Sequence, residues 1–147
     1  HCGAFAVIRL CTYFLAYFCF AFCIRFSPRV GLCWTLALVL ERGLSGLAVA
    51  AFPMAKNTGL AHTFATAADR ESVQKILIVL SVLLAAALIA LGGGALVAAA
   101  LLVLWRYHHV AVKEFGGITG DLAGWFLQKA EFWMLAALAA SQWGGIL

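Results

Sequence analysis

Hydrophobic residues run through this chain in long stretches, and short polar or glycine-rich breaks separate them. A helix needs about 20 apolar residues to cross the hydrocarbon core of a bilayer. Four or five stretches approach that length, so the pattern predicts an all-α, polytopic bundle of about five transmembrane helices. We expect these helices near residues 4–24, 31–53, 73–91, 95–110 and 121–140.

The breaks between the stretches have a recognisable chemistry. The first stretch ends at residues 25–29, Arg-Phe-Ser-Pro-Arg, and a polar segment from Lys56 to Glu71 follows the second. Three consecutive glycines at 92–94 predict a tight hairpin. The fourth stretch ends at residues 105–109, Trp-Arg-Tyr-His-His, a mixture of aromatic and basic side chains that suits the headgroup layer.

Composition supports a membrane location. Of the 147 residues, 65% are hydrophobic and 11% are charged, which is more apolar surface than a soluble domain of this size buries. We therefore expect residues 1–147 to form a single integral-membrane domain surrounded by lipid, with no nucleic-acid partner and with a homo-oligomer left open. The five cysteines lack the spacing of a metal site, so we interpret them as small buried hydrophobic residues.

The distribution of Lys and Arg predicts the orientation. Helix alternation places residues 25–30, the triple glycine and the C-terminus on one side, and residues 54–74 with 106–120 on the other. The first side has Arg25 and Arg29, whereas the second has Lys56, Arg70, Arg106 and Lys113. Because cytoplasmic loops carry the excess of basic residues, the second side should face the cytoplasm, together with His1.

Glu41 and Arg42 lie near the middle of the second stretch, where each charge costs roughly 2.5 to 3.5 kcal/mol on an insertion scale. Neighbours in a helix point about 100° apart, so we do not expect the two to neutralise one another. Two interpretations remain open: a structural role through partners on other helices, or a role for Arg42 in binding an anionic ligand.

A glycine-rich turn precedes the last stretch. Gly116, Gly117 and Gly120 could let the backbone expose successive N–H groups, and Thr119 or Asp121 could cap a helix that begins near residue 121. A helix start of this kind favours anions. The turn is therefore a candidate phosphate-binding element.

Inside that last helix, Asp121, Gly124, Gln128 and Glu131 fall within an arc of about 80°. The two carboxylates are about 15 Å apart along the axis, too far to hold one ion together. Each could bind a different partner, or a ligand could stretch between them. The alternative is a capping aspartate together with a glutamate paired to a basic residue.

Lys56 follows the second stretch directly after Pro53-Met54-Ala55, where proline ends the helix. It could contact a phosphate at the membrane surface. Ordinary anchoring of a span explains a lysine at this position equally well.

The order Gly-Gly-Ile-Thr-Gly-Asp at 116–121, followed by Gly124 and Glu131, resembles the C-terminal signature of the cobalamin synthase family, the adenosylcobinamide-GDP ribazoletransferases. Arg42, the segment from Pro53 to Leu60, and Phe64 match further upstream. The resemblance implies a multi-pass enzyme of the inner membrane that joins adenosylcobinamide-GDP to α-ribazole or its phosphate and releases GMP, with Mg²⁺ as cofactor and a cytoplasmic active face.

The resemblance also implies roles for individual residues. Asp121 would be a catalytic or metal-binding carboxylate and Glu131 a second metal ligand or polar anchor. Arg42 and Lys56 would contact phosphates, together with the glycine turn and Thr119.

This chain departs from the family pattern at several positions. Family members usually carry an acidic cluster of D-G-x-x-D-x-x-D-G type just before the position where this chain begins, and it supplies the principal metal carboxylates. We therefore expect the chain to be the C-terminal portion of a longer enzyme, which leaves activity of the chain alone open. The family also tends to have an acidic residue at Gln128, a small one at Trp125 and Arg at Lys56.

Two other classes of function stay open at this stage. A membrane transporter could line a polar pathway with Glu41, Arg42 and Glu131, although the chain shows no internal repeat. A non-enzymatic membrane subunit could bind haem through His108 or His109, although adjacent histidines on a helix point in different directions.

Overall fold

The computed structural model describes residues 3–55, 70–145 and 147, and within them the chain forms five α-helices and no strand. The predicted all-α bundle is thereby confirmed. The helices begin and end within a few residues of the predicted stretches, except that the fourth continues to Phe115. They are α1 (Ala4–Cys23), α2 (Pro28–Ala51), α4 (Arg70–Ala90), α5 (Gly94–Phe115) and α6 (Gly120–Trp143).

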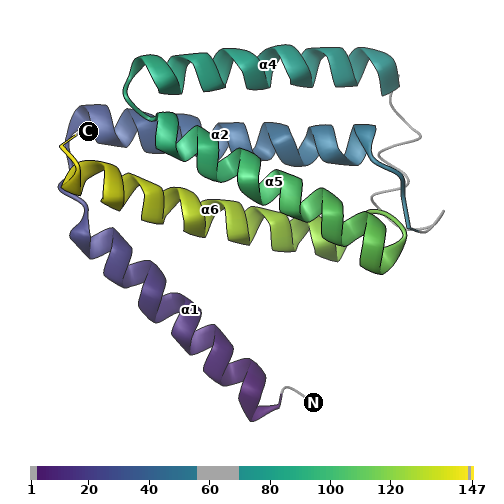
Figure 1. Cartoon of the computed structure of the whole chain (residues 1–147), viewed down its shortest axis with the longest axis horizontal. Helices are drawn as coiled ribbons and strands as arrows, with labels where there is room; N and C mark the ends of the chain where they lie inside the picture. The colour runs from purple at the N-terminus through teal and green to yellow at the C-terminus, as the bar shows by residue number, and fades with distance from the viewer. Residues whose placement is uncertain (1–2, 56–69, 146) are drawn as a thin grey trace.

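Four of these helices, α1, α2, α4 and α5, are long and apolar enough to cross a membrane, as far as the described residues extend. Helix α6 is as long as α2, at 24 residues, but it carries Asp121, Lys129 and Glu131 and is not in that group. It lies lengthwise against α5 and α2 (Figure 1). The polar residues of α6 are therefore held alongside helices that can span the membrane.

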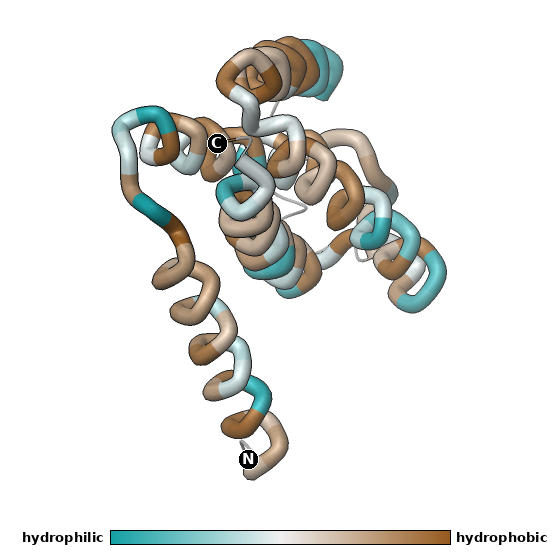
Figure 2. The backbone as a smooth tube through the Cα atoms, turned by 60° about the vertical axis from the view of Figure 1, so that its left-hand side comes forward, coloured by the Kyte–Doolittle hydropathy of each residue, from teal (hydrophilic) through white to brown (hydrophobic). Residues whose placement is uncertain are grey.

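Helices α2, α5 and α6 form the centre of the bundle, and α4 covers α2 (Figure 1). Helix α1 diverges from the other four in both views, and hydrophobic residues run along most of each helix (Figure 2). No residue of α1 is buried, and its contacts are chiefly with α6. A large part of its apolar surface is thus left without a protein partner.

The ends of the helices alternate between two ends of the molecule. The connection from α1 to α2, the α4–α5 hairpin and the C-terminus lie at one end, which we call the α4–α5 end (Figure 1). The exit of α2, the start of α4 and the turn from α5 to α6 lie at the other, the α5–α6 end. This is the grouping of loops that the sequence predicted.

Local chemistry explains where α2 and the hairpin begin. Ser27 caps α2 by accepting a hydrogen bond from the N–H of Val30, and Pro28 occupies the first position of the helix, where it needs no N–H donor. The predicted hairpin is present: Gly92 has φ +87°, which glycine adopts without strain. Arg29 donates from Nε and Nη2 to the carbonyl oxygen of Leu91, at 2.9 and 2.6 Å.

Small side chains let the central helices approach closely. Fully buried alanines occur on α2, α5 and α6, and the stacked rings of Tyr107 and Phe126 join α5 to α6 with centroids 5.1 Å apart. The buried alanines of these three helices include Ala37, Ala48, Ala100, Ala111 and Ala130.

The expectation that the cysteines are buried holds for Cys33 but is wrong for Cys11, Cys19 and Cys23, which are exposed on α1. They are exposed because α1 packs chiefly on one neighbour, α6. Cys2 lies outside the described residues.

Candidate functional site at the start of helix α6

Thr119 is the N-cap of α6, and its Oγ1 accepts a hydrogen bond from the N–H of Leu122 at 3.3 Å. The predicted helix start is confirmed, with Thr119 rather than Asp121 as the cap. Asp121 stands exposed in the first turn and has no hydrogen-bond or ion-pair partner among the described residues. A carboxylate at this point lies near the positive end of the helix dipole.

The glycine turn is arranged differently from the expectation. The N–H groups of Gly116 and Gly117 both point back to the carbonyl oxygen of Ala111 and cap the end of α5. They do not face outward, so the expected run of successive exposed N–H groups is absent at these two residues. The N–H groups of Gly120 and Asp121 have no partner in the described part of the chain and remain available to an anion.

The turn docks on the exit of α2. The N–H of Ile118 donates to the carbonyl oxygen of Pro53 at 2.8 Å, and the N–H of Ala55 donates to the carbonyl oxygen of Ile118 at 3.0 Å. Gly117 has φ +152°, and a Cβ atom there would lie 2.5 Å from the backbone nitrogen of Ala55. Only glycine permits so close an approach of two backbones.

This docking joins two segments that no pattern in the sequence connects. Lys56, the predicted phosphate contact, lies outside the described residues and follows Ala55 in the sequence. The only sequence signal for the docking was Pro53, which ends α2 and leaves backbone groups to be paired.

Glu41 is completely buried in α2, and neither of its carboxylate oxygens has a hydrogen-bond partner among the described residues. Arg42 places its Nε 3.5 Å from Oε1 of Glu41 while its side chain stays 63% exposed. The expectation that these neighbours do not pair is therefore wrong. The arginine side chain is long enough to fold back across the 100° between the two positions.

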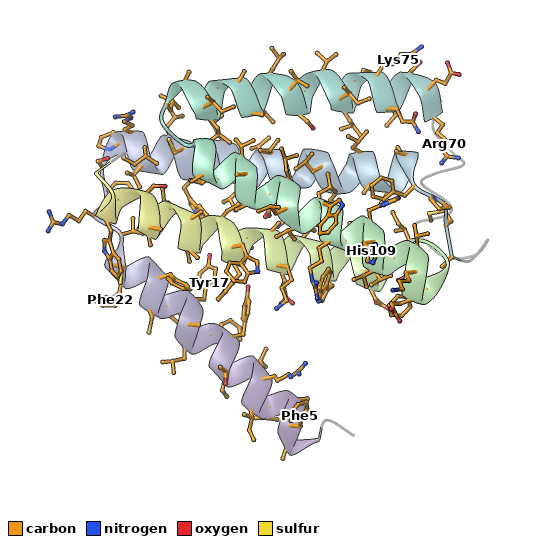
Figure 3. The ribbon with its side chains drawn as sticks, in the orientation of Figure 1. Phe5, Tyr17, Phe22, Arg70, Lys75 and His109 are labelled. Atoms are coloured by element: carbon orange, nitrogen blue, oxygen red, sulfur yellow. The ribbon has the colours of Figure 1, made fainter. Side chains whose placement is uncertain are left out.

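Glu131 of α6 accepts a hydrogen bond from the hydroxyl of Tyr17 on α1, at 2.7 Å. Figure 3 shows Tyr17 pointing from α1 toward α6. Tyr13, one turn earlier, donates to the carbonyl oxygen of Gln128 at 3.4 Å. Of the two interpretations of Glu131, pairing with a basic residue is not found in the described residues, because its partner is a tyrosine of α1.

Glu131 and Glu41 are close enough to interact electrostatically, and both lie within range of Tyr17. We call Tyr17, Glu41, Arg42 and Glu131 the intramembrane polar cluster. It lies where α1, α2 and α6 approach one another. The sequence pointed to three of these residues, whereas Tyr17 was missed because a tyrosine on an apolar helix has no distinguishing pattern.

The candidate residues thus fall into two groups. Thr119, Gly120 and Asp121 lie at the α5–α6 end, and the intramembrane polar cluster lies about 15 Å deeper, by the rise of 1.5 Å per residue from Asp121 to Glu131. The described residues contain no group of three or more side chains that could hold a metal ion. Metal binding by Asp121 and Glu131 stays a prediction.

The two adjacent histidines lie on the aromatic surface near the α5–α6 end. His108 packs edge-on against Phe52 with ring centroids 4.4 Å apart, and His109 stacks on Trp105 at 6.1 Å. Both are exposed. These ring contacts fit the interfacial role that the sequence predicted for residues 105–109.

Together, the apolar helices, the buried carboxylate and the capped start of α6 define a multi-pass integral-membrane protein with polar groups at membrane depth. The chain belongs to the family described as cobalamin-5-phosphate synthase, which matches residues 1–139. This confirms the resemblance that residues 116–121, Gly124 and Glu131 suggested.

A curated relative agrees with the family. The chain is 37% identical over 142 residues to a protein of Lachnoclostridium phytofermentans named adenosylcobinamide-GDP ribazoletransferase. The match covers 95% of this chain and 53% of the relative, so the chain spans about half the length of the relative. No solved structure matches the chain.

Proposed function

We propose that the protein acts as an adenosylcobinamide-GDP ribazoletransferase in the last steps of cobalamin synthesis. The observation that carries this proposal is the family match over residues 1–139, which includes the Gly-Gly-Ile-Thr-Gly-Asp turn and Glu131. The name of the Lachnoclostridium relative supports the same reaction. Nothing in the described residues favours a transporter or a haem-binding subunit.

The reaction is a transfer of a substituted phosphate group. A hydroxyl oxygen on the ribose of α-ribazole, or of its phosphate, forms a new bond to the cobinamide-side phosphorus of the substrate diphosphate. The bond from that phosphorus to the oxygen bridging to GMP breaks, GMP leaves with the bridging oxygen, and the hydroxyl proton passes to a base. Such reactions depend mainly on positioning and on stabilising negative charge.

The start of α6 offers suitable groups for this chemistry. The free N–H groups of Gly120 and Asp121, at the positive end of a helix, suit a phosphate oxygen. The carboxylate of Asp121 is exposed and would accept the hydroxyl proton or bind a cation. Gly116 and Gly117 would act through the position of the turn, because their own N–H groups are already bonded.

Arg42 and Lys56 are the proposed cationic contacts for substrate phosphates, with Arg42 at the level of the deeper cluster. The side chain of Arg42 is largely exposed although it contacts Glu41. Its guanidinium therefore retains N–H groups that could donate hydrogen bonds to a phosphate oxygen. Glu131, bonded to Tyr17, would be a polar anchor deeper in the bundle.

We propose Mg²⁺ as the cofactor, because this ion commonly binds one or two carboxylates together with substrate phosphates. The described residues do not form such a site by themselves, since they gather no three potential ligands. Asp121 could supply one ligand. We also propose that the protein lies in the inner membrane with its α5–α6 end toward the cytoplasm, because nucleotide-linked substrates are made there and the basic residues gather at that end.

The proposal is tested with membranes from cells that express the protein from its own gene. Adenosylcobinamide-GDP and α-ribazole are added, and adenosylcobalamin and GMP are quantified by liquid chromatography and mass spectrometry. We expect equal molar amounts of the two products, loss of both with a chelator, and recovery with Mg²⁺. Membranes that form neither product above the level of cells without the gene would rule out the proposed activity.

A further inference from the structure

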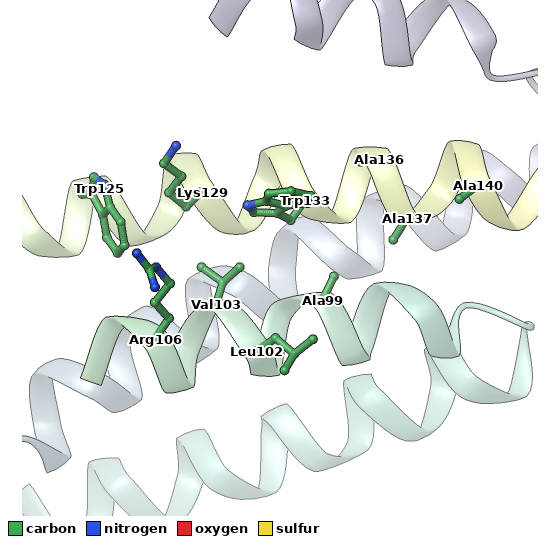
Figure 4. A pocket seen from close by; sticks show the side chains of 10 residues that line it. All are labelled: Ala99, Leu102, Val103, Arg106, Trp125, Lys129, Trp133, Ala136, Ala137 and Ala140. Carbon is green, nitrogen blue, oxygen red and sulfur yellow. The ribbon is translucent and has the colours of Figure 1, made fainter. Parts of the chain in front are cut away.

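A cavity of about 820 Å³ opens between α5 and α6. Figure 4 shows alanines of both helices along its length, with Trp133 on α6 between Lys129 and the alanines of that helix. Its lining is apolar except at one end, where Arg106 of α5 and Lys129 of α6 contribute, and it includes no acidic residue. The lining residues are Ala99, Leu102, Val103, Arg106, Trp125, Lys129, Trp133, Ala136, Ala137 and Ala140. We call this cavity the α5–α6 groove.

The two cations lie at the same height. Arg106 is nine residues before the end of α5, and Lys129 is nine residues after the start of α6. Because the two helices are antiparallel, both α-carbons are about 13.5 Å from the turn that joins them. Long basic side chains at this depth extend toward the headgroup layer, so both charges belong to the same edge of the apolar layer, although the Lys129 side chain points away from α5 in Figure 4.

Neither cation is neutralised by a residue that the structure describes. Arg106 and Lys129 make no ion pair and no hydrogen bond within the described parts of the chain, although a charge so close to the hydrocarbon layer normally has a partner. Trp125 lies beside Arg106 at the same end of the groove (Figure 4). Trp105, which is 69% exposed, directly precedes Arg106 in the sequence. Tryptophans in this position are typical of the membrane interface.

The apolar part of the groove has the length of one leaflet. From Lys129 to Ala140 along α6 the distance is about 16 Å, at 1.5 Å per residue. Half of a hydrocarbon core about 30 Å thick is about 15 Å. An acyl chain whose headgroup lies at the two cations would therefore run down the alanine-lined part of the groove.

We propose that the α5–α6 groove binds a phospholipid with an anionic headgroup. The phosphate and the headgroup charge lie against Arg106 and Lys129, and one acyl chain lies along the alanines of α5 and α6. Basic pockets between transmembrane helices bind anionic headgroups by the same charge complementarity. The site is separate from the start of α6 and from the intramembrane polar cluster, and it does not depend on the proposed transferase activity.

Quenching of tryptophan fluorescence by brominated lipids provides the test, because bromine on an acyl chain quenches only tryptophans that it reaches. The protein is reconstituted with Trp34→Phe, Trp105→Phe and Trp143→Phe, which removes the three tryptophans outside the groove and retains Trp125 and Trp133. Vesicles contain the same fraction of brominated chains, carried either by phosphatidylglycerol or by phosphatidylcholine. We expect the groove to bind phosphatidylglycerol more tightly than phosphatidylcholine, by a factor of about five for each of the two cations.

Two paired variants locate the preference. Arg106→Gln with Lys129→Gln should abolish it, whereas Arg25→Gln with Lys113→Gln, an equal loss of charge outside the groove, should retain it. The charge-preserving pair Arg106→Lys and Lys129→Arg should also retain it, which guards against a general folding defect. Equal quenching by the two headgroups, or a preference that survives the glutamine pair, would overturn the proposal. So would the absence of quenching by either lipid, because that would mean that protein fills the groove.

Discussion

Gly117 is the residue on which the position of the candidate site depends most closely. A Cβ atom there would lie 2.5 Å from the backbone nitrogen of Ala55, and φ is +152°. We predict that Gly117→Ala lowers the free energy of unfolding by about 1 to 3 kcal/mol, the usual range for a strained backbone position. Thermal unfolding in detergent measures the change.

Gly124→Ala is the matched control, because nothing lies within 4 Å of the Cβ position there. Alanine also favours an exposed helix position over glycine by about 1 kcal/mol, so this variant should be as stable as the parent or slightly more stable. Equal stability of the two variants would contradict the docking of the turn on the exit of α2.

Tyr17 is the second residue with a specific structural role. We predict that Tyr17→Phe weakens the attachment of α1, because it leaves Glu131 without its donor at a loss of about 1 to 3 kcal/mol. Limited proteolysis of the connection between α1 and α2 is the measurement, and cleavage should become faster. Tyr13→Phe is the control, because it removes only a hydrogen bond of 3.4 Å, and its cleavage should stay near the rate of the parent. If the Tyr13 variant were cleaved as fast as the Tyr17 variant, the assigned role of Tyr17 would be wrong.

At the scale of elements, the sequence predicted the helices well because their ends have chemical causes. Ser27 and Pro28 begin α2, the glycines at 92–94 form the hairpin, and Thr119 begins α6. The docking of the turn on Pro53 and Ala55 could not be predicted, because it pairs segments more than 60 residues apart. The same holds for the contact of Tyr17 with Glu131, which depends on the angle at which α1 leaves the bundle.

Arg29 links two elements at the α4–α5 end. Its guanidinium donates twice to the carbonyl oxygen of Leu91, so it fixes the start of α2 to the hairpin. Arg29→Gln should speed hydrogen exchange at residues 91–93 several-fold, corresponding to about 1 kcal/mol for a hydrogen bond of this kind. Hydrogen exchange followed by mass spectrometry measures it.

Arg25→Gln is the control for Arg29, because the contacts of Arg25 with Gln142 use its backbone N–H and carbonyl group and not its side chain. Exchange in the hairpin should be unaffected by this change. Hairpin protection that is the same in the Arg29 variant and in the parent would show that the contact contributes nothing to local stability.

At the scale of the whole molecule, the alternation of loops between two ends follows from the order of the five described helices along the chain, and this could be predicted from the sequence. The divergence of α1 could not, because its apolar surface is compatible with burial in protein or with exposure to lipid. The cysteines Cys11, Cys19 and Cys23 of α1 are exposed, so the described residues do not cover this surface.

The orientation is tested by labelling single cysteines in a variant that lacks the native ones. We predict that an impermeant maleimide added to protoplasts labels Gly145→Cys at the α4–α5 end. Glu114→Cys, at the α5–α6 end, should be labelled only after the membrane is permeabilised. The reverse pattern would place the start of α6 outside the cell and contradict the proposed cytoplasmic site.

The central claim is that the capped start of α6 carries the transfer chemistry, and Asp121→Asn tests it most directly. The rate of cobamide formation is measured in membranes that contain equal amounts of inserted parent and variant protein, with Glu114→Gln as a control for an exposed carboxylate across the turn. We predict a loss of at least about 100-fold for Asp121→Asn, the lower range for removing an acid–base group, and little change for the control. Turnover by the Asp121 variant at the parent rate would contradict the claim.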